Sequence, residues 1–411
     1  MENKINTIDL FAGCGGLMEG FEQEGSYTTL ACVEWEKAPC DNLIHRLKTK
    51  WNHLSAENEV IRFDIQRTEE LFTGFSDDDY GSHSGLDSLI TNKKVNVIIG
   101  GPPCQAYSLA GRIRDADGMK YDYRNYLFES YLKVVNRYKP NFFIFENVQG
   151  ILSASPEGTP IVDRIKQSFE ESGYAVSDDF KETMFDLTEF GVPQNRKRLI
   201  ILGVNKDIYK ENSREIIHEF YGVIMPSYKT SKVTVNEAIA DLPKLFPSDE
   251  EYKFDGKKYS HKYDRNSKIK NHLPRFHSKR DIKIFEMLAS DIADGRNEYT
   301  DTSKLRELYK SVTGKDSNVH KYYVLRANSQ SNTIPAHLYK DGLRHIHPDP
   351  EQMRSITVRE AARLQTFDDD YEFIGGMMQQ YKMIGNAVPP KFSLMLGKAL
   401  KRIIDKYGLE R

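Results

Sequence analysis

The stretch 97–108, VIIGGPPCQAYS, combines a nucleophilic side chain with an abrupt end to regular structure. Its first three residues form an apolar β-branched run that predicts a short buried strand, and the Gly-Gly-Pro-Pro that follows can continue neither a strand nor a helix. Ligands bind beyond the carboxyl ends of the strands in an open parallel sheet, so Cys104 is placed for reaction. A lone cysteine is more often a small buried residue, and the rest of the chain has to decide between these two interpretations.

Two further segments offer groups for acid–base or anion-binding chemistry. Residues 142–145 are all apolar and Glu146 ends that predicted strand, where partial desolvation should raise the pKa of its carboxyl group and let it act as an acid. A helix cap is the alternative role for Glu146. Arg196 and Arg198 alternate at the entry to another predicted strand and should point to one side, which suits a planar or anionic substrate.

The elements that would position these groups begin with a glycine-rich turn. Residues 5–11 predict a strand, and the turn Ala-Gly-Cys-Gly-Gly at 12–16 leads into an amphipathic helix, so a ligand could approach the backbone at the positive end of that helix. The turn lacks the GxGxxG spacing of dinucleotide sites and could simply join two packed elements. The next predicted strands end on Glu34 and Asp64. Acids at successive strand ends are typical of a nucleoside pocket, in which Trp35 could stack on the base.

The strand–helix alternation breaks down after about residue 205, and the composition changes. Between residues 251 and 283 the chain has eleven basic and four acidic residues with aromatic residues among them, which predicts a surface that follows phosphates, although a solvated charged face is the alternative. Ser331 and Thr333 lie in a polar run that could read base edges. Residues 66–94 are polar and carry an Asp-Asp-Asp run, and we expect a solvated surface insertion without chemistry there.

The composition indicates a globular chain that is long enough for two domains. It has 411 residues, 39% hydrophobic and 29% charged, with a net charge of -2 and no apolar run of membrane length. Its four cysteines are too few for a disulfide scaffold and include no CxxC pair for zinc. We expect reduced thiols, no metal and a cytoplasmic location, because the N-terminal residues lead directly into a strand pattern without a signal sequence.

Several of these segments occur together in one order. They are DLFAGCGGL, VEW, FDI, GGPPCQAYS, RNYLF, FENVQG, GVPQNRKRLIILG, RSITVREAARLQTF and IGNAVPP. In this order the chain resembles the DNA (cytosine-5) methyltransferases of bacterial restriction-modification systems over nearly its whole length, which favours the reactive interpretation of Cys104. The resemblance implies an α/β fold, with a Rossmann-like S-adenosylmethionine-dependent methyltransferase domain and a smaller inserted target-recognition domain. The catalytic domain should comprise residues 1–205 and 377–411, and the target-recognition domain and hinge residues 206–376.

The resemblance also implies roles for single residues. Cys104 would add to C6 of a flipped cytosine, Glu146 would recognise and protonate N3, and Arg198 with Arg196 would be the cation near the base. In the cofactor pocket, Phe11 would pack on adenine, Glu34 would hold the ribose and Asp64 would meet the adenine amino group, while residues 108–125 would form a closing loop. The implied cofactor residues are Phe11, Ala12, Gly13, Cys14, Gly15, Gly16, Glu34, Trp35, Asp64, Pro102, Leu127 and Asn386. The expected DNA contacts are Gln105, Ser108, Lys257, Lys258, Lys262, Ser331 and Thr333.

The expected partner is double-stranded DNA, with no membrane partner. A cognate restriction endonuclease would act on the same site without a stable complex, and the methyl group would protect host DNA. An RNA cytosine-5 methyltransferase of the same fold is a rival, but the sizeable variable region favours a duplex reader. A catalytically inactive regulator would lack Cys104, Glu146 or Arg198, all of which are present. A nicotinamide oxidoreductase lacks support because the glycine spacing differs.

Overall fold

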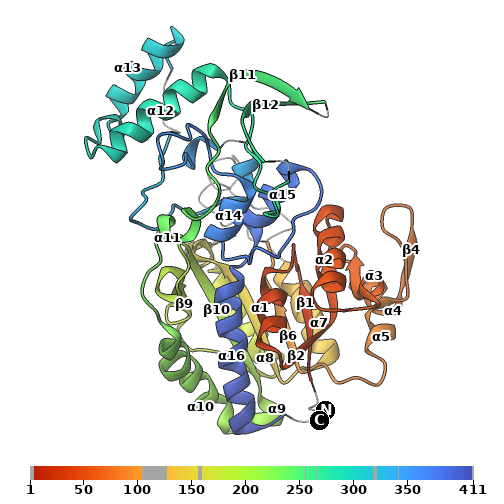
Figure 1. The fold of residues 1–411 in the computed structure, drawn as a ribbon. Coiled ribbons are helices and arrows are strands. Elements are labelled where there is room, and N and C mark those ends of the chain that lie inside the picture. The colour runs from red at the N-terminus through yellow and green to blue at the C-terminus, as the bar shows by residue number, and fades with distance from the viewer. Residues whose placement is uncertain are drawn as a thin grey trace. The chain divides into compact units, whose positions relative to one another are not determined.

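The computed structural model describes residues 4–103, 127–155, 160–254, 256–264, 266–317, 322–340 and 342–409. The chain forms two compact units: residues 1–190, 197–230 and 387–411 make the first, and residues 191–196 and 231–386 make the second (Figure 1). Helices α9 (Lys206–Tyr209) and α10 (Asn212–Glu219) thus belong to the first unit. The predicted division into a catalytic domain and a target-recognition domain at residues 205 and 376 stays a prediction.

The first unit is built on an eight-stranded sheet with the order β3-β2-β1-β6-β7-β10-β8, in which β9 also pairs with β10. Strands β1 (Ile5–Leu10), β2 (Tyr27–Glu34), β3 (Val60–Arg62), β6 (Val97–Gly100) and β7 (Phe142–Val148) are parallel. Strand β10 (Lys197–Asn205) runs antiparallel to β7, β8 (Tyr174–Ala175) and β9 (Met184–Asp186). The predicted α/β class with a mainly parallel sheet is confirmed.

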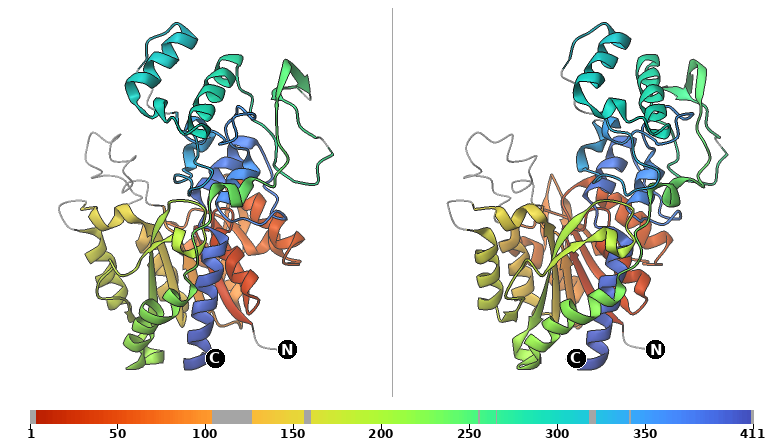
Figure 2. Two further views of the ribbon diagram at one scale, coloured as in Figure 1. Left: turned by 60° about the vertical axis from the view of Figure 1, so that its left-hand side comes forward. Right: turned by 90° about the vertical axis from the view of Figure 1, so that its left-hand side faces the viewer.

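Helices cover both faces of this sheet (Figure 2). Helices α1 (Gly16–Glu24), α2 (Lys37–Thr49) and α16 (Pro390–Tyr407) cover one face, and α4 (Thr68–Thr73), α5 (Gly85–Ile90), α7 (Leu127–Tyr138) and α8 (Ile161–Glu171) cover the other (Figure 1). Buried on both faces, β6 and β7 are almost continuously apolar, as expected for central parallel strands.

The C-terminal helix α16 packs closely on α1. A Cβ atom on Gly20 would lie 2.3 Å from the Leu394 nitrogen, so only glycine allows this approach. The Ser393 hydroxyl donates a hydrogen bond to the Leu17 carbonyl at 2.5 Å, and the Tyr27 hydroxyl donates one to the Gly397 carbonyl at 2.8 Å. The end of the chain therefore fixes the helix that follows the glycine-rich turn.

A tyrosine side chain completes the outer edge of β10. Tyr221 lies in the π-helical turn Phe220–Ile224, and its hydroxyl accepts a hydrogen bond from the Leu202 N–H at 2.7 Å and donates one to the Ile200 carbonyl at 2.8 Å. Strand β9 pairs with residues 197–199 of β10 and β8 with residues 204 and 205. The hydroxyl thus satisfies backbone groups in the interval between these two short strands.

The segment 66–94 is partly buried, so the expectation of a solvated insertion is wrong for its two ends. Leu71 and Phe72 of α4 and Leu86 and Ile90 of α5 enter the main hydrophobic core. Between the helices, β4 (Phe75–Asp77) and β5 (Gly81–His83) form a hairpin. The polar composition concealed these helices because each presents one short apolar face to the sheet.

The second unit has little regular structure. It contains the hairpin of β11 (Pro247–Phe254) and β12 (Lys257–His261), and α11 (Val235–Ile239), α12 (Lys279–Ala293), α13 (Thr302–Thr313), α14 (Val358–Leu364) and α15 (Met377–Asn386). An apolar cluster joins α12 and α13. Much of the remaining interior is polar.

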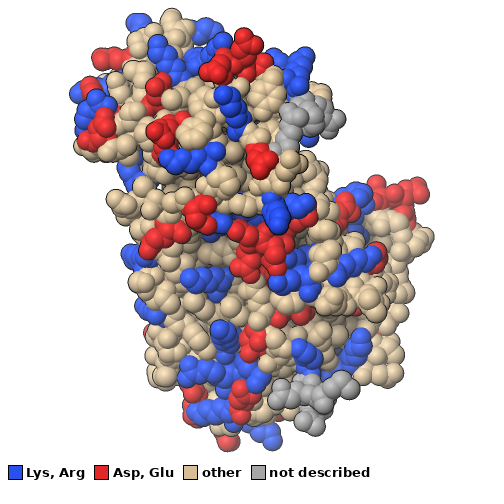
Figure 3. Space-filling model, viewed as in Figure 1, with Lys and Arg blue, Asp and Glu red and all other residues tan. Residues whose placement is uncertain are grey.

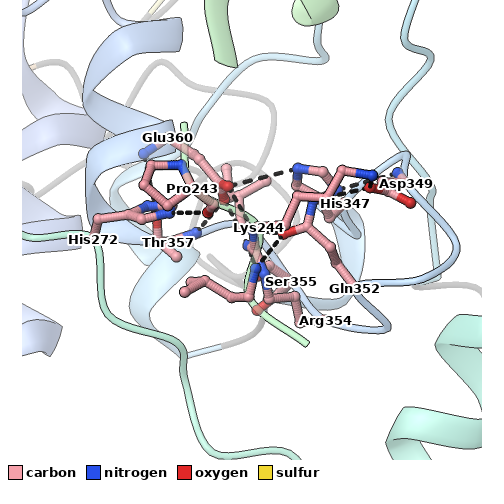
Figure 4. A network of polar contacts seen from close by, with 12 residues as sticks. Pro243, Lys244, His272, His347, Asp349, Gln352, Arg354, Ser355, Thr357 and Glu360 are labelled. Carbon is pink, nitrogen blue, oxygen red and sulfur yellow. Dashed lines mark hydrogen bonds and ion pairs between the residues drawn. The ribbon is translucent and has the colours of Figure 1, made fainter. Parts of the chain in front are cut away.

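A buried ion pair organises this polar interior (Figure 4). The Arg354 guanidinium donates to both carboxylate oxygens of Glu360, at 2.7 and 2.6 Å, and the two side chains are 0% and 1% exposed. Glu360 also accepts the Thr357 N–H at 2.7 Å, in a capping box that begins α14. Burial alone would raise the pKa of Glu360, but Arg354 and His347 hold it well below its ordinary value.

Among the described residues, no helix is long and apolar enough to cross a membrane.

Candidate active site

An ion pair joins the ends of β7 and β10 in the first unit. The Arg198 Nε lies 2.7 Å from the Glu146 Oε1, and the side chains are 11% and 12% exposed. The two residues lie near each other because Arg198 pairs with Val148, and Ile200 with Glu146, in the antiparallel register. Glu146 therefore lies against a guanidinium at this strand end. Its role as an acid stays a prediction.

The turn that precedes Cys104 is fixed beside this ion pair. The buried Asn147 side chain donates a hydrogen bond to the Pro102 carbonyl at 3.3 Å. A Cβ atom on Gly101 would lie 2.5 Å from the Glu146 Oε2, so the carboxylate lies against the turn backbone. The Tyr131 hydroxyl contacts the carbonyls of both β6 and β7, which fixes the two strands together. Sequence reasoning missed Asn147 as an anchor, although its place between Glu146 and the end of β7 was a signal.

Cys104, Gln105, Ser108 and the expected closing loop at 108–125 lie outside the described residues, and their roles stay predictions. The other three cysteines, Cys14, Cys32 and Cys40, are buried thiols. Burial raises the pKa of the Cys32 and Cys40 thiols. Since thiolates are the reactive form, these two cysteines are poor candidates for a nucleophile.

The glycine-rich turn between β1 and α1 has an unusual backbone. Phe11, Gly13 and Gly15 all have positive φ angles, of 57°, 56° and 83°, and Phe11 is a non-glycine residue in this strained region. A Cβ atom on Gly13 would meet nothing within 4 Å, so there is open space in front of the turn. Ala12, Cys14, Gly15 and Gly16 are buried beneath it.

Two carboxylates hold this turn. The Glu34 Oε2 accepts the Gly13 N–H at 2.9 Å, and its Oε1 accepts the N–H groups of Trp35 and Glu36 at 2.9 and 2.8 Å. Burial raises the pKa of Glu34 despite these donors. The Asp9 Oδ2 accepts the Met18 N–H at 3.2 Å, near the start of α1, and burial raises its pKa well above the ordinary value. Asp9 was missed in the sequence, where a single acid in the apolar run 8–11 was the signal.

The remaining cofactor residues lie in different parts of the fold. Trp35 is 53% exposed beside Glu34, and Asp64 follows β3 with its Oδ1 accepting the Gln66 N–H at 3.0 Å. Leu127 is buried at the start of α7. A glycine turn facing open space, a carboxylate at the end of β2 and an exposed indole fit an adenosyl cofactor. Asn386 is exposed at the end of α15 in the second unit, and its role stays a prediction.

Arg196 does not share the environment of Arg198. It precedes β10 and belongs to the second unit, where its buried guanidinium donates to the carbonyls of Ile334 at 3.2 Å and Gly385 at 3.3 Å. The strand alternation that we expected to align the two arginines therefore does not apply. These bonds give Arg196 a structural role, and its place near a target base stays a prediction.

The expected DNA contacts fall into two groups. Lys257, Lys258 and Lys262 are exposed on or next to β12, and Lys262 lies 3.6 Å from the fully exposed Asp249. Over α12 and α13, basic and acidic side chains are interspersed on the face shown in Figure 3. Ser331 is buried, with its hydroxyl donating to the Asn332 carbonyl, and Thr333 donates to the Asn195 carbonyl. These hydroxyls have internal partners, and their contact with bases stays untested.

Comparison with known proteins gives one consistent family. A model of the C-5 cytosine-specific DNA methylases matches residues 5–402. A type II methyltransferase of Bacillus paralicheniformis is 34% identical, over 97% of this chain and 99% of that protein. A type II methyltransferase of Haemophilus parahaemolyticus is 30% identical, over 97% of this chain and 87% of that protein.

Two solved structures support the fold. A protein assigned as a DNA modification methyltransferase encoded within an E. coli prophage has a TM-score of 0.66 at 22% identity, over 98% of this chain and 100% of that chain. An Entamoeba histolytica methyltransferase has a TM-score of 0.53 at 14% identity, over 98% of this chain and 99% of that one. The predicted Rossmann-like methyltransferase fold is confirmed. This chain therefore belongs to the C-5 cytosine-specific DNA methylase family and is a DNA (cytosine-5) methyltransferase.

Proposed function

We propose that the enzyme transfers a methyl group from S-adenosylmethionine to C5 of a flipped cytosine in a specific double-stranded DNA sequence, through a covalent bond between Cys104 and C6. In its host it would protect cytoplasmic DNA from a cognate restriction endonuclease, as the type II names of its relatives suggest.

One observation carries this proposal: the turn that leads to Cys104 is anchored beside the Glu146–Arg198 ion pair. Asn147 holds the Pro102 carbonyl, and the Glu146 carboxylate lies against Gly101. Cys104 follows Pro102 by two residues, and an extended chain spans at most about 7 Å over that interval. This short interval supports the proposal that a nucleophile, a carboxyl group and a cation act together beyond the carboxyl ends of β6 and β7.

The chemistry requires these three groups. The Cys104 thiolate adds to C6, and Glu146 supplies a proton to N3, so that electron density reaches C5 and makes it nucleophilic. Arg198 orients the Glu146 carboxylate toward the ring. S-adenosylmethionine supplies a methyl group on a positively charged sulfur. After methylation a base removes the C5 proton, and the electrons of that bond expel the Cys104 thiolate. N3 returns its proton to Glu146, which restores the neutral ring.

The proposal assigns recognition to the second unit and cofactor binding to the first. Glu34, Trp35 and Asp64 would hold the adenosine part, with the glycine turn next to the amino-acid part. Lys257, Lys258 and Lys262 would contact phosphates, which position a duplex without reading its sequence. Because a stacked base cannot reach Cys104, the cytosine has to leave the duplex.

A duplex that carries 5-fluorocytosine at the target position tests the covalent step. Bisulfite sequencing of DNA from a methylation-free host that expresses the enzyme would first identify the target site, and a tRNA pool would serve as the rival substrate. Fluorine cannot leave as a cation, so the enzyme should methylate the base and remain bonded to it.

The adduct should require S-adenosylmethionine, survive denaturing electrophoresis and map to the peptide that contains Cys104. Cys104→Ser should abolish it, whereas Cys40→Ser, at a buried thiol, should not. An adduct formed by Cys104→Ser, or one attached to another cysteine, would overturn the mechanism.

A further inference from the structure

The hairpin of β4 and β5 packs on Phe63, the residue that precedes Asp64. The Phe75 ring stacks on Phe63 with a centroid distance of 3.8 Å, and the Tyr80 ring meets Phe63 edge-on at 5.2 Å. The Arg67 guanidinium lies 4.6 Å from the Phe63 ring centroid. Phe63 is 1% exposed. One side of the hairpin is therefore packed against the end of β3, while its other side is exposed.

Polar contacts fix the tip of the hairpin as well. The Asp77 Oδ1 accepts the N–H groups of Tyr80 at 2.7 Å and Asp79 at 3.0 Å, and its Oδ2 accepts from Arg67 at 2.6 Å. The Arg62 guanidinium donates to the Asp79 carbonyl at 2.9 Å and lies 5.3 Å from the Tyr80 ring centroid. Acidic side chains gather on the surface at the place of β4 (Figure 3), and Asp77 organises the turn of this hairpin.

These contacts place Tyr80 next to the strand ends of the proposed adenosine site. Arg62 is paired with Glu34 in the parallel register, and the Phe63 N–H donates to the Glu34 carbonyl at 3.0 Å. Tyr80 packs on both Arg62 and Phe63, and Asp64 is the next residue. Burial and the nearby Asp64 carboxylate raise the pKa of the Tyr80 hydroxyl. Within the described chain, the buried Nε of Arg62 has no hydrogen-bond partner, so this edge keeps an unused donor.

We propose that the β4–β5 hairpin forms an outer wall of the adenine site and that Tyr80 is a further cofactor-binding residue. This role rests on the proposed function. The Tyr80 ring covers the edge of the adenine, opposite the exposed Trp35 indole, and its hydroxyl shares the adenine amino group with Asp64. The segment that connects β3 to β6 therefore contributes to cofactor selection.

Calorimetric titration of the full-length enzyme with S-adenosylhomocysteine tests the wall, because binding is measured without turnover. Tyr80→Ala should weaken binding about 3- to 10-fold, the usual worth of an aromatic contact. Tyr228→Ala is the matched control: Tyr228 is also half-buried, with the Arg402 guanidinium 6.0 Å from its ring centroid, but lies outside the proposed site. It should bind like the wild type. Equal affinity of Tyr80→Ala and the wild type would overturn the proposal.

Tyr80→Phe keeps the ring packing and tests the hydroxyl alone. Because this change is conservative, it also keeps the proposal testable if Tyr80→Ala fails to fold. The wild type should prefer S-adenosylhomocysteine to S-inosylhomocysteine, which has oxygen in place of the amino group, and Tyr80→Phe should lose 2-fold or more of that preference. If Tyr80→Phe kept the full preference for S-adenosylhomocysteine over S-inosylhomocysteine, the hydroxyl would have no role in cofactor binding. If the wild type bound neither compound, the proposed function itself would fail.

Discussion

Each compact unit contains an arginine–glutamate ion pair at a strand or helix end, and the two pairs differ in how deeply they are buried. Arg354 and Glu360 are bonded through two guanidinium nitrogens and both carboxylate oxygens, with the Thr357 N–H as a further donor. The Arg198 Nε lies 2.7 Å from the Glu146 Oε1, and these side chains are 11% and 12% exposed. A fully enclosed pair stabilises structure, whereas a carboxylate that keeps some exposure can meet a substrate.

The position of the pairs explains this difference. Glu360 lies in the first turn of α14 and is enclosed by its own helix and by Arg354, with His347 3.5 Å away. Glu146 lies at the end of a central strand, where the absence of a side chain at Gly101 lets the carboxylate lie against the turn backbone. The same two residue types thus stabilise α14 in the second unit, whereas at the end of β7 they form part of the proposed active site.

Removal of the Glu146 charge should have the largest effect, and it should lower the methylation rate without changing stability. Glu146→Gln keeps the size and hydrogen-bonding reach of the side chain but cannot transfer a proton, so kcat should fall about 10² to 10⁴-fold. Single-turnover methylation of a cognate duplex measures this. The melting temperature and the affinity for S-adenosylhomocysteine should stay close to wild-type values. Turnover within twofold of the wild type would remove Glu146 from the mechanism.

The matching change in the second unit should affect stability instead. Glu360→Gln leaves Arg354 buried without its counter-charge and should lower the free energy of unfolding by about 3–5 kcal/mol, measured by urea titration. Glu237→Gln is the control, because Glu237 belongs to a capping box of the same design that is exposed, and it should cost about 1 kcal/mol or less. Equal losses in both variants would show that burial of the ion pair contributes nothing.

Acid should destabilise the second unit before the first. Burial lowers the pKa of His261, His345 and His347 in the second unit to about 4, from an ordinary value of 6.5. Their unfolded forms take up protons first, so stability is full above pH 6.5 and falls as the pH drops toward 4, by up to about 1.4 kcal/mol per pH unit for each group. In the first unit Glu59 raises the pKa of His53, which has the opposite sign: its contribution is present at low pH and lost as pH rises.

Hydrogen exchange as a function of pH measures this difference. Between pH 6.5 and 4 the amides of the second unit should lose protection before those of the first. Trp35 and Trp51, the two tryptophans of the chain, both lie in the first unit, so their fluorescence should change at lower pH than the exchange of the second unit. Loss of exchange protection at the same pH in both units would contradict the role given to the buried histidines.

The smallest expected effect concerns the surface of the second unit. Replacing Lys257, Lys258 and Lys262 by glutamine should weaken binding to cognate and unrelated duplexes alike, and the slope of log K against log salt should fall by about 0.9 for each phosphate that is no longer neutralised. Fluorescence anisotropy at several salt concentrations measures both quantities. The control is the same change at three lysines of α16, namely Lys398, Lys401 and Lys406. An effect on the cognate duplex alone would identify base-reading lysines.

Periodicity in the sequence was enough to locate most of the sheet. The apolar runs before Gly100 and Glu146 predicted β6 and β7, and the glycine-rich turn predicted the start of α1, because each signal is local. The contacts that give these elements their function are not local. Asn147 reaches Pro102 across 45 residues, and the Arg196 guanidinium reaches Gly385 across 189. The residues near Asn147 and Arg196 in the sequence do not specify these partners, so the contacts could be found only in the folded structure.

The second unit was harder to predict for a related reason. Its interior depends on histidines and on an ion pair that a sequence reader assigns to the surface, since charged residues are seldom buried without partners. The insertion at 66–94 was predicted to be solvated, and parts of it are packed on the sheet. Its acidic run suggested solvent, yet Asp77 and Tyr80 belong to a hairpin packed on β3.

The hydroxyl of Tyr221, set into the border of β10, has a consequence for how copies of the enzyme behave toward one another. An unpaired strand border offers its amides to any other extended chain, which is a route to aggregation. By taking the Leu202 N–H and the Ile200 carbonyl for itself, Tyr221 leaves an incoming strand nothing to pair with at that point. A single phenol thus closes this part of the sheet border to pairing with a strand of a second molecule.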